Sequence, residues 1–168
     1  MTLAKGIASG VTFGLFMGTE EVSSTMTGGD HYTTYGGNAL PCAAANATFE
    51  VIQAEGLVEN AATVGEAAFD RLEEMKEDHE LIGDVRGKGL HIGLELVLDH
   101  DTKEPADEEA SEVREATYHE GLLVSRCGIY GNVVRLTPPL TVTEDEMMEM
   151  LNRLDTAITN VEKEVAVA

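Results

Sequence analysis

Residues 82–98 read IGDVRGKGLHIGLELVL, and they mark the point at which a helical pattern gives way to an extended one. Residues 84–89 hold glycines among charged residues, which predicts a turn. Residues 90–98 are mostly apolar and follow that turn, which predicts a strand. The chain is therefore expected to be helical before this stretch and a mixture of helices and strands after it.

Two helices are predicted before residue 80. The first begins near Leu40 and ends at Gly56, and its small apolar residues favour a buried helix. The second has apolar residues at spacings of three and four, which form one stripe opposite a face of carboxylates. The residues of that stripe are Leu57, Ala61, Val64, Ala68, Leu72 and Met75.

After residue 98 the sequence predicts a polar connection, a surface helix and two strands, at residues 99–107, 108–120, 122–125 and 133–136. A final amphipathic helix follows. Thr143 and Glu146 have the spacing of a capping box, in which each side chain satisfies a backbone donor of the other residue. The apolar positions of the final helix are Met147, Leu151, Leu154, Ile158 and Val161.

The first forty residues have a different character. They are rich in glycine, and they predict short strands at residues 2–4 and 13–18 and a loop over residues 24–38. Such short strands need a larger sheet to pair with, whereas the residues from about 80 onward can form a small α+β layer by themselves. The chain is therefore expected to begin in the middle of a domain.

The charge of the chain excludes one class of function. There are 31 acidic residues against 11 basic ones, for a formal net charge of −20, and such a surface repels nucleic-acid phosphates. An acidic disordered tail is one explanation of this charge, but 43% of the residues are hydrophobic. The explanation we favour is a folded, salt-adapted protein with a carboxylate-coated surface, whose stability would rise with molar KCl.

Cysteine spacing and hydropathy exclude further classes of protein. Cys42 and Cys127 are far apart, so they predict neither a disulfide framework nor a zinc site, and the histidines show no metal-ligand spacing. No apolar run is long enough to span a membrane. The expected location is the cytoplasm.

Lys5 is the first candidate for chemistry. It is the only Lys or Arg in the first 70 residues, and it lies between Leu3-Ala4 and Gly6-Ile7. An amine held among apolar groups becomes neutral more readily, and a neutral amine can attack a carbonyl to form a Schiff base. A lysine in a glycine turn can equally be a solvated surface residue, and the spacing alone does not decide between the two readings.

Arg135 and the segment 33–38 are the other candidates. Arg135 lies between apolar residues of a predicted strand, and a buried guanidinium needs an anion such as a carboxylate. The alternative is an internal ion pair with one of the many acidic residues. Segment 33–38, TTYGGN, offers hydroxyls and backbone amides just ahead of a helix, where phosphate binds well.

Four segments together resemble class III aminotransferases of fold type I. They are TLAKGIASG (2–10), HYTTYGGNALPCAAA (31–45), IGDVRGKGLHIGLEL (82–96) and CGIYGNVVRLTPPLTVTEDE (127–146). In order, they are similar to the family's cofactor lysine, its loop into a small-residue helix, the strand that opens its C-terminal domain and its substrate-arginine strand. The resemblance covers nearly the whole chain.

The resemblance implies an α/β fold in which part of the large cofactor-binding domain is followed by a complete small α+β domain. The implied division is a large-domain part over 1–56, a connecting helix over 57–79 and the small domain over 80–168. Lys5 would bind pyridoxal 5′-phosphate covalently, and Thr34 would bind its phosphate, usually from the neighbouring subunit of a homodimer. Arg135 would bind the carboxylate of an amino acid or keto acid substrate.

Two departures from the family limit these expectations. Thr12 stands where the family usually has proline, which softens one turn. Family members are more than twice as long, and their glycine phosphate loop, ring-stacking aromatic residue and ring-nitrogen aspartate all precede the lysine. We therefore expect this chain alone to have little or no transaminase activity.

Several activities stay open at this point. The stretch 130–135 most resembles 4-aminobutyrate aminotransferases, and related members act on ornithine or acetylornithine or decarboxylate dialkylglycines. A separate alternative is that the chain is a non-catalytic remnant or one half of a split enzyme.

Overall fold

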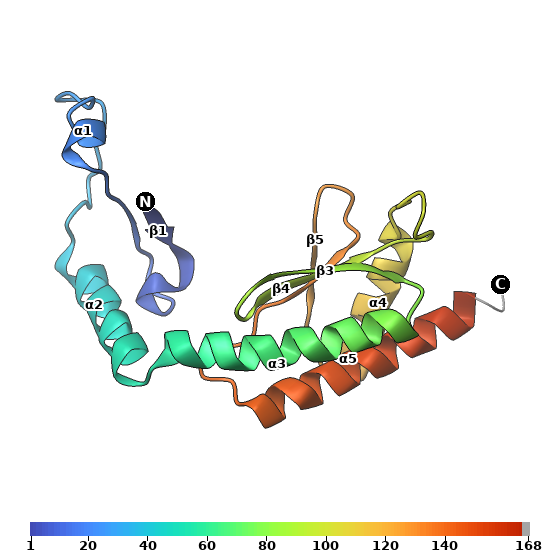
Figure 1. The fold of residues 1–168 in the computed structure, drawn as a ribbon. Coiled ribbons are helices and arrows are strands. Elements are labelled where there is room, and N and C mark those ends of the chain that lie inside the picture. Colours follow the sequence, from blue (N-terminus) through green and yellow to red (C-terminus); the bar gives the residue numbers. More distant parts are fainter. Residues whose placement is uncertain (166–168) are drawn as a thin grey trace. The chain divides into compact units, whose positions relative to one another are not determined.

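The computed structural model describes residues 1–165, and it divides the chain into two compact units, Met1–Leu57 and Val58–Ala168 (Figure 1). We call them unit 1 and unit 2 and describe each by itself. The predicted three-part division of the chain stays a prediction. Within the described residues, no helix is long and apolar enough to cross a membrane.

Unit 1 is built from short elements. In chain order they are β1 (Thr2–Ala4), the 3₁₀ helix η1 (Lys5–Ala8), β2 (Gly14–Phe16), α1 (Glu20–Ser23) and α2 (Ala39–Ala54). The strands pair antiparallel, with Leu3 opposite Leu15. Both predicted strands and the loop over 24–38 are confirmed, and α2 begins one residue before the predicted start. Asn38 caps α2, because its side chain accepts a hydrogen bond from the Leu40 amide at 3.0 Å.

Helix α2 is less covered than predicted. Only Ala45 is buried along the whole helix, while Leu40 keeps 73% of its surface exposed and Val51 is also exposed. The prediction of a buried helix is therefore wrong for unit 1 by itself. The physical reason is size, since a two-stranded ribbon offers too little apolar surface to cover a helix of four turns.

Unit 2 contains a four-stranded antiparallel sheet with three helices. The elements are α3 (Leu57–Asp78), β3 (Ile82–Lys88), β4 (His91–Leu96), α4 (Asp107–His119), β5 (Ser125–Cys127), β6 (Val133–Leu136) and α5 (Glu144–Val165). The strand order is β3-β4-β6-β5, and every neighbouring pair is antiparallel. Helices α3 and α5 run alongside each other (Figure 1). The first residue of helix α3, Leu57, is the last residue of unit 1.

One hydrophobic core holds unit 2 together. From Val64 onward the predicted stripe of α3 is buried in this core, Ala61 is partly buried against it, and all of the predicted apolar residues of α5 are buried. Val85, Leu94 and Val134 form one row across β3, β4 and β6 on the core side of the sheet. Because side chains alternate along a strand, the next residues face away from this core.

Two predicted elements of unit 2 are wrong in type or position. Residues 84–88 form most of strand β3 rather than a turn, because their backbone pairs with β4 in a hairpin, and only Gly89 lies in the turn itself. Gly87 is essential to that strand, since its φ of 152° suits glycine and a side chain there would collide with the His91 carbonyl oxygen. Residues 122–124 precede strand β5, which begins at Ser125, the last residue of the predicted strand. The Leu122 amide bonds to the Thr117 carbonyl oxygen at 2.8 Å and so ends α4.

The capping box at the start of α5 is confirmed. The Thr143 amide donates to Glu146 Oε2 at 2.9 Å, and the Glu146 amide donates to Thr143 Oγ1 at 3.3 Å. These two bonds satisfy donors that a helix start leaves open. The predicted helix over 108–120 and strand over 133–136 are also present.

Candidate cofactor and substrate site

Lys5 lies where strand β1 ends and η1 begins. Its φ of 62° is in the left-handed region, which is uncommon for a residue with a side chain and is held here by the surrounding turn. Its side chain is exposed, and a Cβ at the neighbouring Gly6 would meet nothing within 4 Å. The apolar, water-poor setting predicted for Lys5 is therefore not supplied by unit 1. The flanking Ala4 and Gly6 are themselves exposed.

The Thr33–Asn38 turn presents Thr34 at the surface of unit 1. Thr34 is exposed, and Gly37 has a φ of 70°, which lets the chain turn into α2. A hollow of about 660 Å³ lies between this turn and the β1–β2 hairpin, and its lining includes Phe13, Leu15 and Tyr35. Neither Lys5 nor Thr34 lines this hollow. Unit 1 therefore contains both predicted cofactor residues without bringing them into one enclosed pocket.

Arg135 lies on strand β6, on the face of the sheet turned away from the core. Its neighbours along the strand, Val134 and Leu136, are buried in the core, and Arg135 alternates to the other face. In register, it lies opposite Gly93 of β4 on one side and Ser125 of β5 on the other. Gly93 has no side chain of its own beside Arg135, and a Cβ there would meet Val133 Cγ1 at 3.2 Å.

The guanidinium of Arg135 lacks a partner for one of its donors. Its Nε is buried and has no hydrogen-bond acceptor among the residues that the structure describes. No ion pair in residues 1–165 includes Arg135 either. The alternative reading of an internal ion pair is thus not what the structure contains. A buried donor without a partner is costly, so Arg135 is a candidate for binding an anion.

Arg86 gives a contrasting case on the same face of the sheet. It lies in the same cross-strand row as Gly93 and Arg135, and its Nη1 contacts Asp84 Oδ2 at 2.7 Å and Glu95 Oε2 at 2.5 Å. Hydrogen bonds to these two carboxylates raise the pKa of Arg86 above its ordinary value. Arg86 is thus satisfied internally, which leaves Arg135 as the arginine of this row that can bind a ligand.

The residues present fit a pyridoxal phosphate site in their chemistry. The Lys5 amine is exposed and takes part in none of the ion pairs of the described chain, so it is free to condense with an aldehyde. Thr34 offers an exposed hydroxyl for a phosphate oxygen. Arg135 offers a planar fork for a carboxylate. In the part of the chain that the structure covers, no three His, Cys, Asp or Glu side chains gather as a metal site requires.

Sequence patterns did not reveal the flanks of Arg135. Gly93 and Ser125 lie 42 and 10 residues before it, and only the pairing register of β4, β6 and β5 brings them beside it. Two local signals were present in the sequence, namely the alternation of side chains along strand 133–136 and the glycine inside strand 91–96. They could have predicted which face of the sheet Arg135 lies on, but not which residues lie beside it.

Comparison with protein families places these residues in context. The model of the class III aminotransferase family matches residues 1–158, so the chain belongs to this family. Class III aminotransferases use pyridoxal phosphate and act on amino acid and keto acid substrates. The predicted family, the partial fold-type-I architecture and the cofactor are thereby confirmed.

Three curated relatives illustrate the range of the family. The chain is 40% identical over 155 residues to a mitochondrial alanine–glyoxylate aminotransferase 2 homolog of Arabidopsis thaliana, covering 92% of this chain and 32% of that protein. It is 40% identical over 163 residues to a leucine/methionine racemase of Thermococcus litoralis, covering 97% and 36%. It is 37% identical over 151 residues to a 4-aminobutyrate aminotransferase of Mycobacterium leprae, covering 90% and 34%.

A solved structure gives the same picture for the fold. An amine transaminase from an uncultivated Pseudomonas species, described in its pyridoxal-phosphate-bound form, matches with a TM-score of 0.83 at 35% identity. The match covers 95% of this chain and 38% of that one. The chain thus spans about a third of the length of the curated relatives named above.

Proposed function

We propose that this chain forms part of a pyridoxal-phosphate-dependent aminotransferase that moves an amine between an omega-amino acid, of the 4-aminobutyrate kind, and a keto acid. The observation that carries the proposal is the buried, partnerless Nε of Arg135 in a chain with 31 acidic residues. Such a group calls for a ligand carboxylate, which both proposed substrates have. The relative from Mycobacterium leprae and the resemblance of residues 130–135 support the choice of amino donor.

Each residue has a defined role in this proposal. Pyridoxal phosphate, when bound, supplies the electron sink that makes the amine-bearing carbon of the substrate acidic. Lys5 would hold the cofactor covalently, and its Nζ would be the base that accepts the proton from the amine-bearing carbon of the substrate. The Thr34 hydroxyl donates to the cofactor phosphate. Arg135 binds the substrate carboxylate with two parallel N–H groups, which fixes the distance to the reacting carbon.

The assembly and location of the whole enzyme are part of the proposal. We infer a homodimer in which Thr34 contacts the cofactor of the neighbouring subunit, because unit 1 alone does not place Thr34 and Lys5 in one pocket. The cytoplasmic location stays a prediction.

Amino-acid racemisation is a second candidate. It is favoured by the 40% identity to the racemase of Thermococcus litoralis, which is as high as that to the Arabidopsis aminotransferase. Racemisation needs a proton delivered to the opposite face of the substrate carbon, whereas transamination needs a keto acid that accepts the amine. Inversion of a chiral amino acid without any keto acid would favour racemisation, and keto-acid-dependent amine transfer would favour transamination.

The first experiment is borohydride trapping of pyridoxal phosphate on the purified 168-residue chain in high salt, followed by peptide mapping. We expect one adduct at Lys5 that is lost in Lys5→Ala. Lys103→Ala is the matched control, because Lys103 is also an exposed lysine with a left-handed φ, of 58°. Scattered labelling, or an adduct that survives in Lys5→Ala, would contradict the cofactor role. That outcome would favour a non-catalytic remnant or one half of a split enzyme.

A second experiment tests Arg135 without the cofactor. The Nε–H signal of Arg135 should shift in NMR spectra when 4-aminobutyrate is added, because the carboxylate satisfies the buried donor. Butylamine, which lacks the carboxylate, should leave the signal in place. The Arg86 signal is the internal control, since its guanidinium already has two carboxylate partners. Equal shifts for both arginines would count against a specific carboxylate site.

A further inference from the structure

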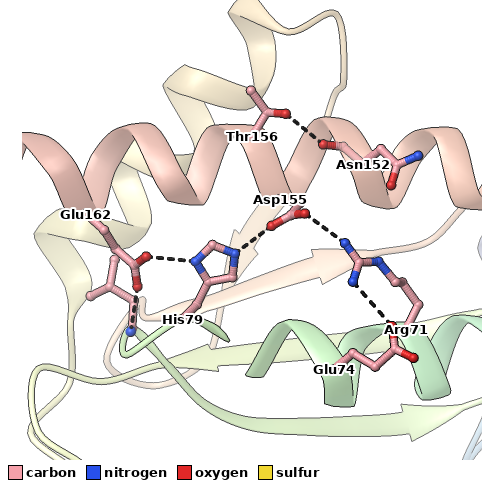
Figure 2. Close-up of polar contacts among 8 residues, drawn as sticks. Arg71, Glu74, His79, Asn152, Asp155, Thr156 and Glu162 are labelled. Atoms are coloured by element: carbon pink, nitrogen blue, oxygen red, sulfur yellow. Dashed lines mark hydrogen bonds and ion pairs between the residues drawn. The ribbon is translucent and has the colours of Figure 1, made fainter. Parts of the chain in front are cut away.

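His79 is the most enclosed histidine of the described chain, and it is not used in the proposed chemistry. It directly follows α3 and keeps only 5% of its surface exposed. Its Nε2 lies 2.6 Å from Asp155 Oδ1, and its Nδ1 lies 2.7 Å from Glu162 Oε2 (Figure 2). Both carboxylates come from α5 and are seven residues apart, so they lie on one face of that helix, two turns apart.

This geometry requires two protons on one imidazole ring. A neutral imidazole has one N–H donor and one lone pair, whereas an imidazolium has two N–H donors. Ionised carboxylates only accept hydrogen bonds. A neutral His79 would therefore set a nitrogen lone pair against a carboxylate oxygen at hydrogen-bonding distance, and one of the two contacts would have to open.

The second oxygens of the carboxylates tie the cluster to the rest of unit 2. Asp155 Oδ2 accepts from Arg71 Nη2 at 2.8 Å, and Arg71 also contacts Glu74 at 3.3 Å. Glu162 Oε1 accepts from the Leu81 amide at 3.0 Å. The cluster thus joins three segments, namely helix α3, the turn into β3 and helix α5 (Figure 2).

We propose that His79 is a proton-dependent clasp that holds the C-terminal half of α5 against the end of α3 and the start of β3. When the imidazolium loses a proton, the clasp loses either its Asp155 or its Glu162 contact. Glu162 is the contact that opens first. Asp155 keeps a charged partner in Arg71, whereas Glu162 keeps only a backbone amide.

Other charged groups near His79 do not replace these partners. Lys76, Glu77 and Glu80 come from its own segment, and Asp99 and His100 come from the connection after β4. These five residues share an open hollow of about 400 Å³ with His79. Water screens charges along such a surface, while the contacts to Asp155 and Glu162 are direct hydrogen bonds.

The pH dependence follows from the direction of the pKa shift. Burial by itself lowers the pKa of His79, but the hydrogen bonds and charges of Glu162 and Asp155 outweigh it and raise the pKa above its ordinary value. A raised folded-state pKa means that the clasp contributes its full stability below the unfolded pKa. The contribution is lost as pH rises through the folded pKa.

The test is amide hydrogen exchange of the 168-residue chain over a pH series, corrected for intrinsic exchange rates. We expect protection of residues 156–163 to fall by about tenfold as pH rises through the folded pKa of His79, because the end of α5 loses a contact. In His79→Gln the same segment should have low protection at every pH. His119→Gln is the control, since His119 is exposed and lies 3.7 Å from one carboxylate of its own helix.

NMR of the wild-type ring nitrogens decides the question if His79→Gln does not fold. Both nitrogens of His79 should stay protonated at a pH above the ordinary histidine pKa. Loss of a proton from His79 at or below the ordinary histidine pKa would overturn the proposal. It would also be overturned if His79→Gln kept the wild-type pH dependence of exchange in residues 156–163.

Discussion

Units 1 and 2 share one chain but differ in how they are held together. Unit 2 has a continuous hydrophobic core between its sheet and helices, whereas the buried hydrophobic residues of unit 1 are only Ala8, Ala45 and Leu57. Lys5 and Thr34 lie in unit 1, and Arg135 lies in unit 2. The proposed substrate arginine is therefore on a self-supported scaffold, while the proposed cofactor residues are not.

The difference shows that the apolar surface available for packing, and not the composition of a segment, decides whether that segment is buried in a core. Helix α2 is rich in alanine and is far more apolar in composition than α5, yet α5 is the helix whose apolar stripe is buried. A four-stranded sheet can cover such a stripe, and a two-stranded ribbon cannot. We therefore expect mutations to act very unequally in the two units.

The largest effect is expected from cutting into the core of unit 2. Leu151 is fully buried, so Leu151→Ala should lower the free energy of unfolding by about 2–5 kcal/mol. Leu40→Ala in unit 1 makes the same chemical change at an exposed position and should change it by less than about 0.5 kcal/mol. Urea unfolding followed by circular dichroism measures both. Equal losses of stability in the two variants would show that Leu40 of unit 1 is packed in a core as Leu151 is, which would contradict the difference between the units.

A smaller loss is expected from Gly65→Ala in α3. Alanine normally favours a helix over glycine, but a Cβ at Gly65 would lie 2.7 Å from the Gly89 carbonyl carbon and oxygen. Backbone cannot move aside easily, so the variant should lose about 1–3 kcal/mol. Gly28→Ala in unit 1 would meet nothing within 4 Å and should be nearly neutral. A stabilised Gly65→Ala would mean that α3 can shift from the hairpin.

The next effect concerns the start of α5. Thr143→Ala removes a hydroxyl that bonds to the Glu146 amide, and it should cost about 1 kcal/mol in thermal or urea unfolding. Thr141→Ala is a matched control at an exposed position just before the cap. If both variants lost the same stability, the capping box would not be the cause.

The smallest effect is the pH dependence of that cap. Hydrogen bonds from the Thr143 amide and hydroxyl hold the pKa of Glu146 below its ordinary value. A depressed carboxyl pKa gives stability that is present above the unfolded pKa and is lost as pH falls through the folded pKa. The difference in melting temperature between wild type and Thr143→Ala should therefore shrink in acid. Because the Thr143 amide bond to Glu146 stays in the variant, a difference that stayed constant to the lowest pH would exclude a role for the Glu146 charge in the hydroxyl contact.

Local patterns predicted much of unit 2 correctly. The stripes of α3 and α5, the capping box at Thr143 and the strand over 133–136 each depend on residues close together in sequence. The turn predicted over 84–89 failed because glycine content resembles a turn when the partner strand is unknown. The predicted burial of α2 failed for the same reason, since burial depends on which surface is available.

The candidate site divides along similar lines. The sequence by itself predicted the family, which the family match confirms, because short motifs and their order carry that information. The roles that it gives to Lys5, Thr34 and Arg135 stay predictions. Only the tertiary structure decided that the Arg135 Nε has no acceptor in the described chain and that Arg86 has two. Only the tertiary structure shows that His79 contacts the carboxylates of Asp155 and Glu162, which are 76 and 83 residues away in sequence. The physical reason is that unsatisfied donors and charge pairs are set by contacts between distant segments, which local periodicity does not encode.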